Sequence, residues 1–371
     1  MKKLLLTTAL VGVAFTAAPA MAEVSLGLGG HFKGYMTYND QDEIAGVETN
    51  EVDILRDTEI HFTGETTLDN GLTVGFHAET NANGGVNSDF EESYLYFAGN
   101  WGRVNFGAED GAQYLLQVAA PAADTNVDGI RQYINPVNFA ALGVAGAGVL
   151  DYAADASGYA DKITYITPVF SGFQAGVSYT PDVGNAGVVG EDGYATAFGV
   201  RTDDVAGAFG EGYEAAIRYE GQFDAFRLAI GAGYTHVELE ADGGPAPAVS
   251  TFTDDRQAWN IGANVGFGPF NVGAAYVTDN NATDSSDSDT WVVGVDYTTG
   301  PFVIGASYLN RDDEDAAGAG VDLESDRYSA GVTYTYGPGM SFRGSVHHVN
   351  ADAGAADADA TSVLLGTQVN F

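Results

Sequence analysis

The feature that most constrains this fold is an alternation of apolar and polar residues in runs of strand length. In the run 361–371, Val363, Leu365, Val369 and Phe371 share one face, and the other face is polar. Successive side chains of a strand point to opposite sides, so this run has one polar face and one apolar face. A final strand of this kind, ending in an aromatic residue, indicates an outer-membrane β-barrel.

The first 22 residues predict export from the cytoplasm. Lys2 and Lys3 precede an apolar stretch that begins at Leu4, and Ala20-Met21-Ala22 supplies a small-x-small cleavage pattern. We therefore expect residues 1–22 to be a secretory signal peptide and residues 23–371 to form one barrel domain. A short membrane anchor is the alternative, but the apolar stretch is short for a spanning helix, which favours cleavage.

Beyond this stretch, the sequence has no run of roughly 20 apolar residues, the length that a membrane-spanning helix needs. The chain has no cysteine, which excludes thiol nucleophiles and cysteine metal sites. Spanning helices are thus excluded, whereas alternating strands are not. Such a chain can cross a bilayer only as a closed barrel, in which every backbone group is paired.

Turn signals divide the chain into about sixteen strand-length runs. Tight turns rich in Gly, Asn, Asp and Pro lie at 69–71, 99–102, 168–172, 222–224, 268–269, 299–301 and 337–339. Longer acidic connections alternate with them, near 39–53, 81–89, 109–161, 181–211, 241–254, 279–289, 310–325 and 351–360. The runs between are approximately 24–38, 54–68, 72–80, 90–98, 103–108, 162–168, 173–180, 212–221, 225–240, 255–267, 270–278, 290–298, 302–309, 326–336, 340–350 and 361–371. An even count with short turns on one side and long loops on the other is typical of an all-β, antiparallel transmembrane barrel.

Charge indicates the kind of partner. The chain has 14 basic and 51 acidic residues, a net charge of -37. This balance repels nucleic acid and favours cations. A plainer interpretation, compatible with the first, is that acidic loops keep the protein soluble and bind calcium loosely. The acidic clusters 203–204, 254–255 and 312–315 lack the spacing of an EF-hand, so no cofactor is expected and a metal site stays open.

Several segments together resemble a known family. They are the signal peptide, the order of turns and strands, the segment Lys162–Phe173, and the terminal Val369-Asn370-Phe371. In these the chain is similar to the sixteen-stranded general porins of Gram-negative outer membranes, most of all the alphaproteobacterial ones. The resemblance implies a homotrimer in the outer membrane, in contact with lipid and lipopolysaccharide. It also implies passive diffusion of small hydrophilic solutes and ions, here with a preference for cations.

The resemblance also implies where the channel narrows. In such porins the third long loop folds into the barrel and places acidic side chains opposite basic ones on the wall. The third long connection here, residues 109–161, is the longest, and its length favours a packed, functional insertion. We call it the third loop. Its apolar part, 139–150, is expected to pack against the inner wall or to form a short helix. The acidic candidates for the constriction are Glu109, Asp110, Asp124, Asp128 and Asp151.

Strand parity supplies the basic candidates on the wall. Where apolar residues such as Leu28 and Phe76 face outward, the residues between them face the lumen. The resulting set is His31, Lys33, Arg56, His61, His77 and Arg103. Arg56 is the exception, because it shares parity with Ile60 and should face lipid, unless it lies above the membrane or a bulge changes the phase.

Three functions other than that of a general porin are open to a chain with this pattern. A substrate-selective channel for a sugar or peptide is the nearest alternative, and a saturable, blockable current would reveal it. A barrel enzyme needs a nucleophile or an acid–base pair, but metalloprotease, serine-hydrolase and phosphate-loop motifs are absent, so no enzyme is expected. A secreted adhesin or lectin would use similar strands without membrane insertion.

Overall fold

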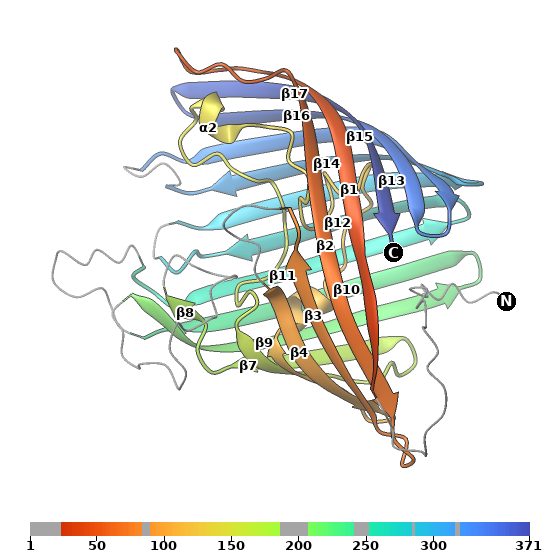
Figure 1. Ribbon diagram of the computed structural model, residues 1–371. Helices are drawn as coiled ribbons and strands as arrows, with labels where there is room; N and C mark the ends of the chain where they lie inside the picture. The colour runs from red at the N-terminus through yellow and green to blue at the C-terminus, as the bar shows by residue number, and fades with distance from the viewer. Residues whose placement is uncertain (1–23, 84–89, 186–206, 241–251, 284–285, 316–319) are drawn as a thin grey trace.

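The computed structural model describes residues 24–83, 90–185, 207–240, 252–283, 286–315 and 320–371, which form an antiparallel barrel (Figure 1). Its sheet has 17 strands in the described residues, of which β8 is a two-residue strand paired only with β9. The other sixteen close into a ring, as the alternation predicted. The signal-peptide prediction lies outside the described residues.

The strands and helices follow in chain order. The strands are β1 Ser25–Gln41, β2 Val52–Thr67, β3 Thr73–Asn81, β4 Phe90–Gly99, β5 Gly102–Ala108, β6 Asp161–Ile166, β7 Phe173–Thr180, β8 Gly184–Asn185, β9 Ala208–Phe223, β10 Phe226–Leu239, β11 Arg256–Phe267, β12 Phe270–Asp279, β13 Ser288–Thr299, β14 Phe302–Asp313, β15 Leu323–Gly337, β16 Met340–Ala353 and β17 Ala356–Asn370. Two short helices, α1 Ala112–Leu115 and α2 Phe139–Leu142, both lie in the third loop. Neither of these helices, the two in the described part of the chain, is long and apolar enough to cross a membrane.

The last strand closes the ring against the first. β17 pairs with β1 in antiparallel register, with Asn370 opposite His31 and Leu365 opposite Met36. Phe371 continues the ladder, because its backbone exchanges two hydrogen bonds with Gly30. The barrel edge is therefore fully paired along this seam, as a strand in a bilayer requires.

The alternation sorts side chains onto two faces of the barrel. On β13, Trp291 and Val293 are exposed on the outer face, whereas Thr290 and Val292 are buried on the inner face. The same pattern holds on β1, where Leu28 lies outside. The outer surface is thus an apolar band that suits lipid, and the inner surface faces the lumen.

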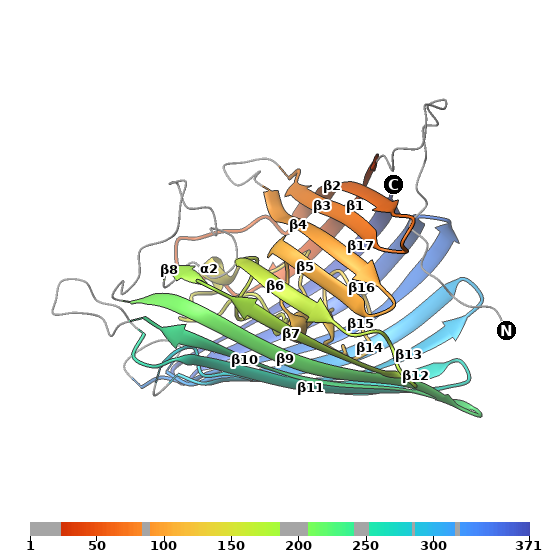
Figure 2. The ribbon, with the colours of Figure 1, turned by 90° about the horizontal axis from the view of Figure 1, so that it is seen from below.

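The short connections gather at one end of the barrel, at the right of Figure 2, and α2 lies toward the other end. The turns between β11 and β12 and between β13 and β14 take only two residues each, 268–269 and 300–301. This asymmetry matches the predicted arrangement, with short turns on one side and long loops on the other.

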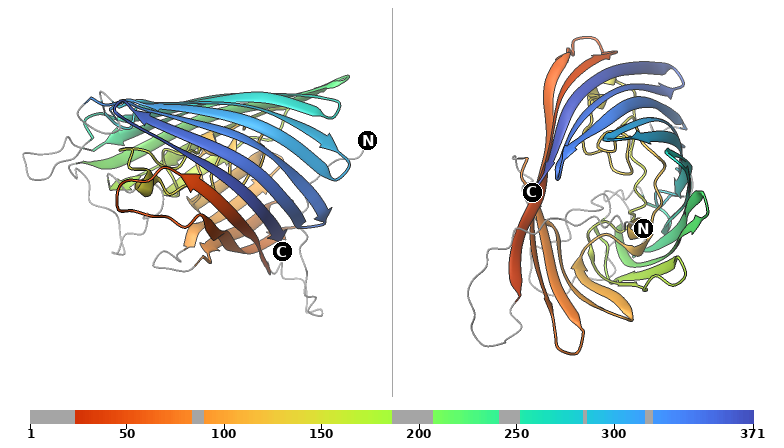
Figure 3. Two further views of the ribbon diagram at one scale, coloured as in Figure 1. Left: turned by 90° about the horizontal axis from the view of Figure 1, so that it is seen from above. Right: turned by 90° about the vertical axis from the view of Figure 1, so that its right-hand side faces the viewer.

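The third loop lies inside the ring of strands, as the right-hand view of Figure 3 shows in yellow. Its apolar part packs against the inner wall, where Leu142 and Leu150 join one hydrophobic cluster with Val292, Leu309 and Val349. The segment 139–150 therefore does both things expected of it, since it also contains α2.

Glycines on the inner wall let the backbone of the third loop lie flat against the strands. A Cβ added to Gly262 of β11 would lie 2.0 Å from the carbonyl oxygen of Val118, and one added to Gly294 of β13 would lie 1.8 Å from that of Pro121. Neither glycine needs a left-handed backbone, so each is required by close approach. The path of the loop is therefore set partly by where the wall lacks side chains.

Replacing Gly262 and Gly294 together by Val is expected to push residues 118–121 away from this wall and to lower the single-channel conductance. The measurement is conductance in planar bilayers. Gly337→Ala is the control, because a Cβ there meets nothing within 4 Å. Unchanged conductance in the double variant would contradict this account of the loop's seat.

Candidate functional site

A polar cavity of about 460 Å³ separates the third loop from the inner face of β1–β4. The wall side contributes His31, Lys33, Glu59, His61, Glu79 and Glu92. The loop side contributes Asp110, Tyr114, Thr125, Asn126, Arg131, Tyr133 and Tyr159, and Arg343 and Gln368 complete the lining. This is where the third loop faces the strands that carry most of the predicted basic residues.

Three of the predicted wall residues of β1 and β2 face this cavity. His31, Lys33 and His61 all line it. Lys33 is buried there, with its Nζ 2.8 Å from Asp57 Oδ2 and 3.1 Å from the centre of the Tyr133 ring. A carboxylate and an aromatic face therefore hold the ammonium group of Lys33, which reduces its effect on passing ions.

His77 and Arg103 lie further along the same wall. His77 Nε2 is 3.2 Å from Glu79 Oε2, and its ring packs against Tyr94. The Arg103 guanidinium lies over the Tyr96 ring at 4.0 Å and donates to Asn105 Oδ1 at 2.6 Å. Both side chains are inward, but neither belongs to the cavity lining.

The inclusion of Arg56 among the wall residues is wrong. It is exposed on the outer face of β2 beside Ile54, and it donates hydrogen bonds to the carbonyl oxygens of Ala82 and Asn83. Its neighbour in sequence, Asp57, is the residue that faces inward. No bulge shifts the phase of the β1–β2 register at this point. Parity alone therefore gave the right placement, and Arg56 is not a wall residue.

The wall is not a basic cluster, because acidic side chains of the same parity stand between the basic ones. They are Asp57, Glu59, Glu79 and Glu92. The sequence itself indicated these acids, since Asp57 and Glu59 lie four and two residues before His61 and so share its face. The prediction selected basic residues on these strands and passed over the acids that share their face.

Of the predicted loop acids, Asp110 reaches the cavity. Arg131, which the sequence prediction missed, binds it at 2.6 Å and binds Asp155 at 2.7 Å. The Arg131 guanidinium also lies over the Tyr114 ring at 4.4 Å. Burial and the charge of Asp155 raise the pKa of Asp110 well above its usual value, and Arg131 opposes this shift.

Asp124 and Asp128 were predicted to lie at the constriction, but neither lines the cavity. Asp124 is almost fully buried, where it accepts hydrogen bonds from Arg343 at 2.8 Å and from the Tyr35 hydroxyl at 3.0 Å. Asp128, equally buried, accepts from the backbone N–H groups of Ala123 and Asp124. The oxygens of both carboxylates are occupied by these hydrogen bonds. Asp128 thereby holds the third loop to itself, and Asp124 holds it to the strands of the wall.

Glu109 and Asp151 do not belong to the cavity lining. Glu109 is buried, and its Oε2 has no hydrogen-bond partner in the described part of the chain. Burial raises the pKa of Glu109 to about 7, although Arg103 pulls in the opposite direction. Asp151 is half-buried, and burial raises its pKa as well.

Basic side chains from later strands hold the third loop in place, and the sequence prediction missed them. Arg327 of β15 is fully buried and donates to the carbonyl oxygens of Val127 and Leu150. Lys162 of β6 donates to the carbonyl oxygens of Glu109 and Gly158. Parity would have turned these residues inward too, but only the tertiary fold shows that the loop passes over them.

The cavity lining carries a small negative formal charge. It contains four carboxylates and three cationic side chains, together with two histidines. With all four carboxyls ionised and both histidines neutral, the formal charge is -1. The arrangement therefore combines a polar cavity with fixed charges of both signs, which favours polar solutes over oily ones.

Selectivity is expected to depend on pH through Glu109. Below its pKa of about 7 the carboxyl is neutral, and above that pH it adds a negative charge near Arg103 on the inner wall. Cation preference should thus rise as pH increases through neutrality. The measurement is the reversal potential across a salt gradient at several pH values. Glu109→Gln should flatten part of this rise, and an identical pH profile in that variant would contradict the prediction.

Comparisons with known proteins place these features in context. A family model described as Gram-negative porin matches residues 7–355. An outer membrane porin protein of Bordetella pertussis is 27% identical over 227 residues, which cover 54% of this chain and 54% of the relative, so the match spans about half of its length.

Solved structures show the same fold. An anion-selective porin from Comamonas acidovorans matches with a TM-score of 0.63 and 18% identity, over 94% of this chain and 100% of that chain. A loop-deletion mutant of an outer membrane protein of Vibrio cholerae matches with a TM-score of 0.58 and 14% identity, over 94% and 99% of the two chains.

Proposed function

Because this chain belongs to the Gram-negative porin family and so forms a pore in the outer membrane, we propose that it passes small hydrophilic solutes and ions by passive diffusion, with a preference for cations. The family and the fold are those of non-enzymatic channels. We further propose that the working unit is a homotrimer in contact with outer-membrane lipid and lipopolysaccharide, as is usual for the family.

The observation that carries the proposal is the polar cavity between the third loop and the β1–β4 wall. Its lining is charged on both sides, so an apolar solute that enters gains nothing to offset the ordered water it displaces. The third loop, which forms one side of the cavity, is held by charged and polar contacts such as the Asp124–Arg343 pair. A fixed, wet constriction suits diffusion of hydrophilic solutes.

Cation preference is supported by two charge balances. The cavity lining has a formal charge of -1, and the whole chain has a net charge of -37. A negative potential at and around a pore raises the local concentration of cations. The similar porin from Comamonas acidovorans is anion-selective, so the sign of selectivity must follow from the side chains of each pore and not from the shared fold.

Reconstitution into planar bilayers tests the pore. We expect stepwise increases of current as single proteins insert, with a conductance proportional to bulk salt. Before boiling, the protein should migrate on a detergent gel as a trimer, and after boiling as a monomer. A protein that inserts in the bilayer yet gives no conductance steps would contradict the proposal.

A further inference from the structure

Three histidines stand in a row across neighbouring strands of the cavity wall. His31 of β1, His61 of β2 and His77 of β3 all point inward, with ring centroids 5.9 Å and 5.4 Å apart along the row. Glu59 and Glu79 stand between them. The register of the strands fixes this pattern, because Glu59 lies opposite His31 and Glu79 lies opposite His61.

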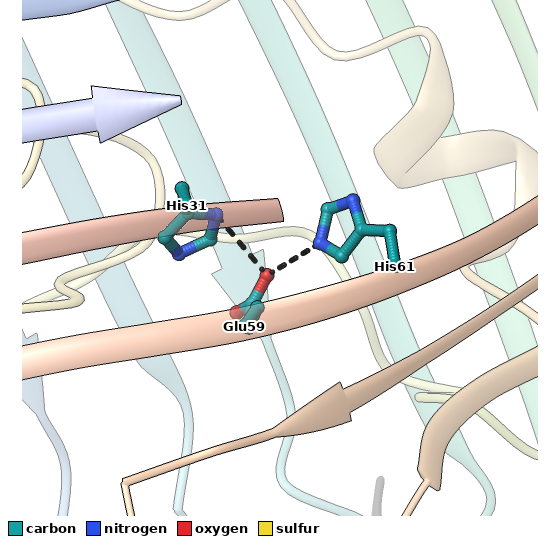
Figure 4. Close-up of side chains that lie close together, drawn as sticks. All are labelled: His31, Glu59 and His61. Carbon is teal, nitrogen blue, oxygen red and sulfur yellow. Dashed lines mark hydrogen bonds and ion pairs between the residues drawn. The ribbon is translucent and has the colours of Figure 1, made fainter. Parts of the chain in front are cut away.

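One carboxylate oxygen is shared by the first two rings. Glu59 Oε2 lies 3.5 Å from His31 Nδ1 and 3.2 Å from His61 Nε2, as the dashed lines of Figure 4 show. The potential ligand atoms of these three residues all lie within 4.8 Å of one another. Ligands about 2.1 Å from a tetrahedral zinc ion are about 3.4 Å apart, so the observed spacings are close to those of a zinc site.

The surroundings of His31 favour binding of a metal by its Nδ1. Its other ring nitrogen, Nε2, lies 3.0 Å from Asp57 Oδ2. Lys33 Nζ, at 2.8 Å, holds the same oxygen of Asp57. A histidine that donates its second N–H to a carboxylate is the usual outer arrangement of metal-binding histidines, because it fixes the tautomer and the direction of the ring.

From these contacts we propose that His31, Glu59 and His61 bind one divalent transition-metal ion of the zinc class on the wall of the pore. Two imidazole nitrogens and one carboxylate oxygen suit Zn²⁺, Co²⁺ or Ni²⁺, whereas Ca²⁺ and Mg²⁺ prefer oxygen ligands alone. The remaining coordination positions open toward the cavity, which His31, Glu59 and His61 all line. His77 and Glu79 form a second group that shares His61, so the two groups compete for that ligand.

Metal binding does not depend on the proposed pore function, but its expected effect on the current does. An ion bound there adds two positive charges and changes the formal charge of the cavity lining from -1 to +1. It also occupies part of a cavity of about 460 Å³. Zinc should therefore lower the conductance of the pore and reduce its cation preference, and a chelator should reverse both effects.

The binding test uses the full-length, detergent-purified protein and Co²⁺, whose visible absorption reports tetrahedral coordination. We expect one Co²⁺ per chain, displaced by Zn²⁺ and unaffected by excess Ca²⁺. His61→Gln should abolish the absorption bands, and Asp57→Asn, which removes only the outer carboxylate, should weaken binding about 10-fold to 100-fold. His348→Gln is the matched control, since His348 lies away from the row and contacts Thr361.

Gel migration before and after boiling would show whether each variant is folded. If His61→Gln does not assemble, Glu59→Gln and His31→Asn test the same site. Absence of cobalt binding in the native protein, or equal binding in the native protein and all ligand variants, would overturn the proposal. Binding by a protein that conducts no current would leave the metal site intact and reject the pore function instead.

Discussion

Replacing Asp124 by Leu is expected to shift the reversal potential of the pore toward anions and to loosen the third loop. Asp124 is buried and accepts hydrogen bonds from Arg343, Tyr35 and the Asn126 backbone. Truncating one partner of a buried ion pair costs about 3–5 kcal/mol, because the other charge is left without its counter-ion. Arg343 also lines the cavity, so its uncompensated charge would act directly on passing ions.

Two further variants separate charge from packing in this prediction. Asp124→Asn keeps the shape of the side chain, so it should shift the reversal potential while it lowers thermal stability less than Leu does. Asp69→Asn removes the same charge from an exposed turn and should change neither property. The measurements are the reversal potential and the temperature at which the unboiled form dissociates on a gel. A reversal potential that is unchanged in both Asp124 variants would contradict the assigned role of the Asp124–Arg343 pair.

Replacing Arg131 by Gln should have the opposite effect and increase cation preference. The guanidinium group neutralises Asp110 and Asp155, and its side chain is only 22% exposed. Without it, the two carboxylates lose the cation that binds them both. The pKa of Asp110 is already raised by burial and by Asp155, and loss of Arg131 raises it further. The gain in cation preference should therefore grow with increasing pH, as Asp110 ionises.

A double variant tests the interaction between the two charges. Asp110→Asn combined with Arg131→Gln removes one negative and one positive charge, so its reversal potential should return close to that of the native protein. The four proteins form a double-mutant cycle. If Arg131→Gln moved the reversal potential toward anions, the assignment of Asp110 to the conducting path would be wrong.

The architecture was predictable because it depends on local alternation. Sixteen runs, their order and the closing contact of the last strand with the first all follow from side chains that take turns facing lipid and lumen. The ends of the strands were less predictable. β9 begins at Ala208 and β14 continues to Asp313, four residues beyond the expected limits in each case. Residues 310–313 are polar on both faces, so the alternation that marks a strand disappears there while the hydrogen bonds of β14 continue. At the start of β9, Ala208 and Phe209 are both buried, so that end does not alternate either.

The candidate site was predictable only in part. Parity placed His31, Lys33 and His61 on the lumen face, since that placement needs no knowledge of the rest of the fold. The partners of the third loop could not be found in this way. Asp124 and Arg343 are 219 residues apart, and their contact depends on the path of a loop whose own sequence has no strand period. That path is set by glycines and buried cations on strands far along the chain.

The central claim is a water-filled, cation-preferring pore, and the reversal potential of the native protein tests it most directly. The measurement uses a potassium chloride gradient across a planar bilayer, with a chelator present so that metal at the histidine row does not alter the charge. We predict a reversal potential with the sign given by potassium moving down its gradient more readily than chloride. A reversal potential of zero or of the opposite sign would contradict the account.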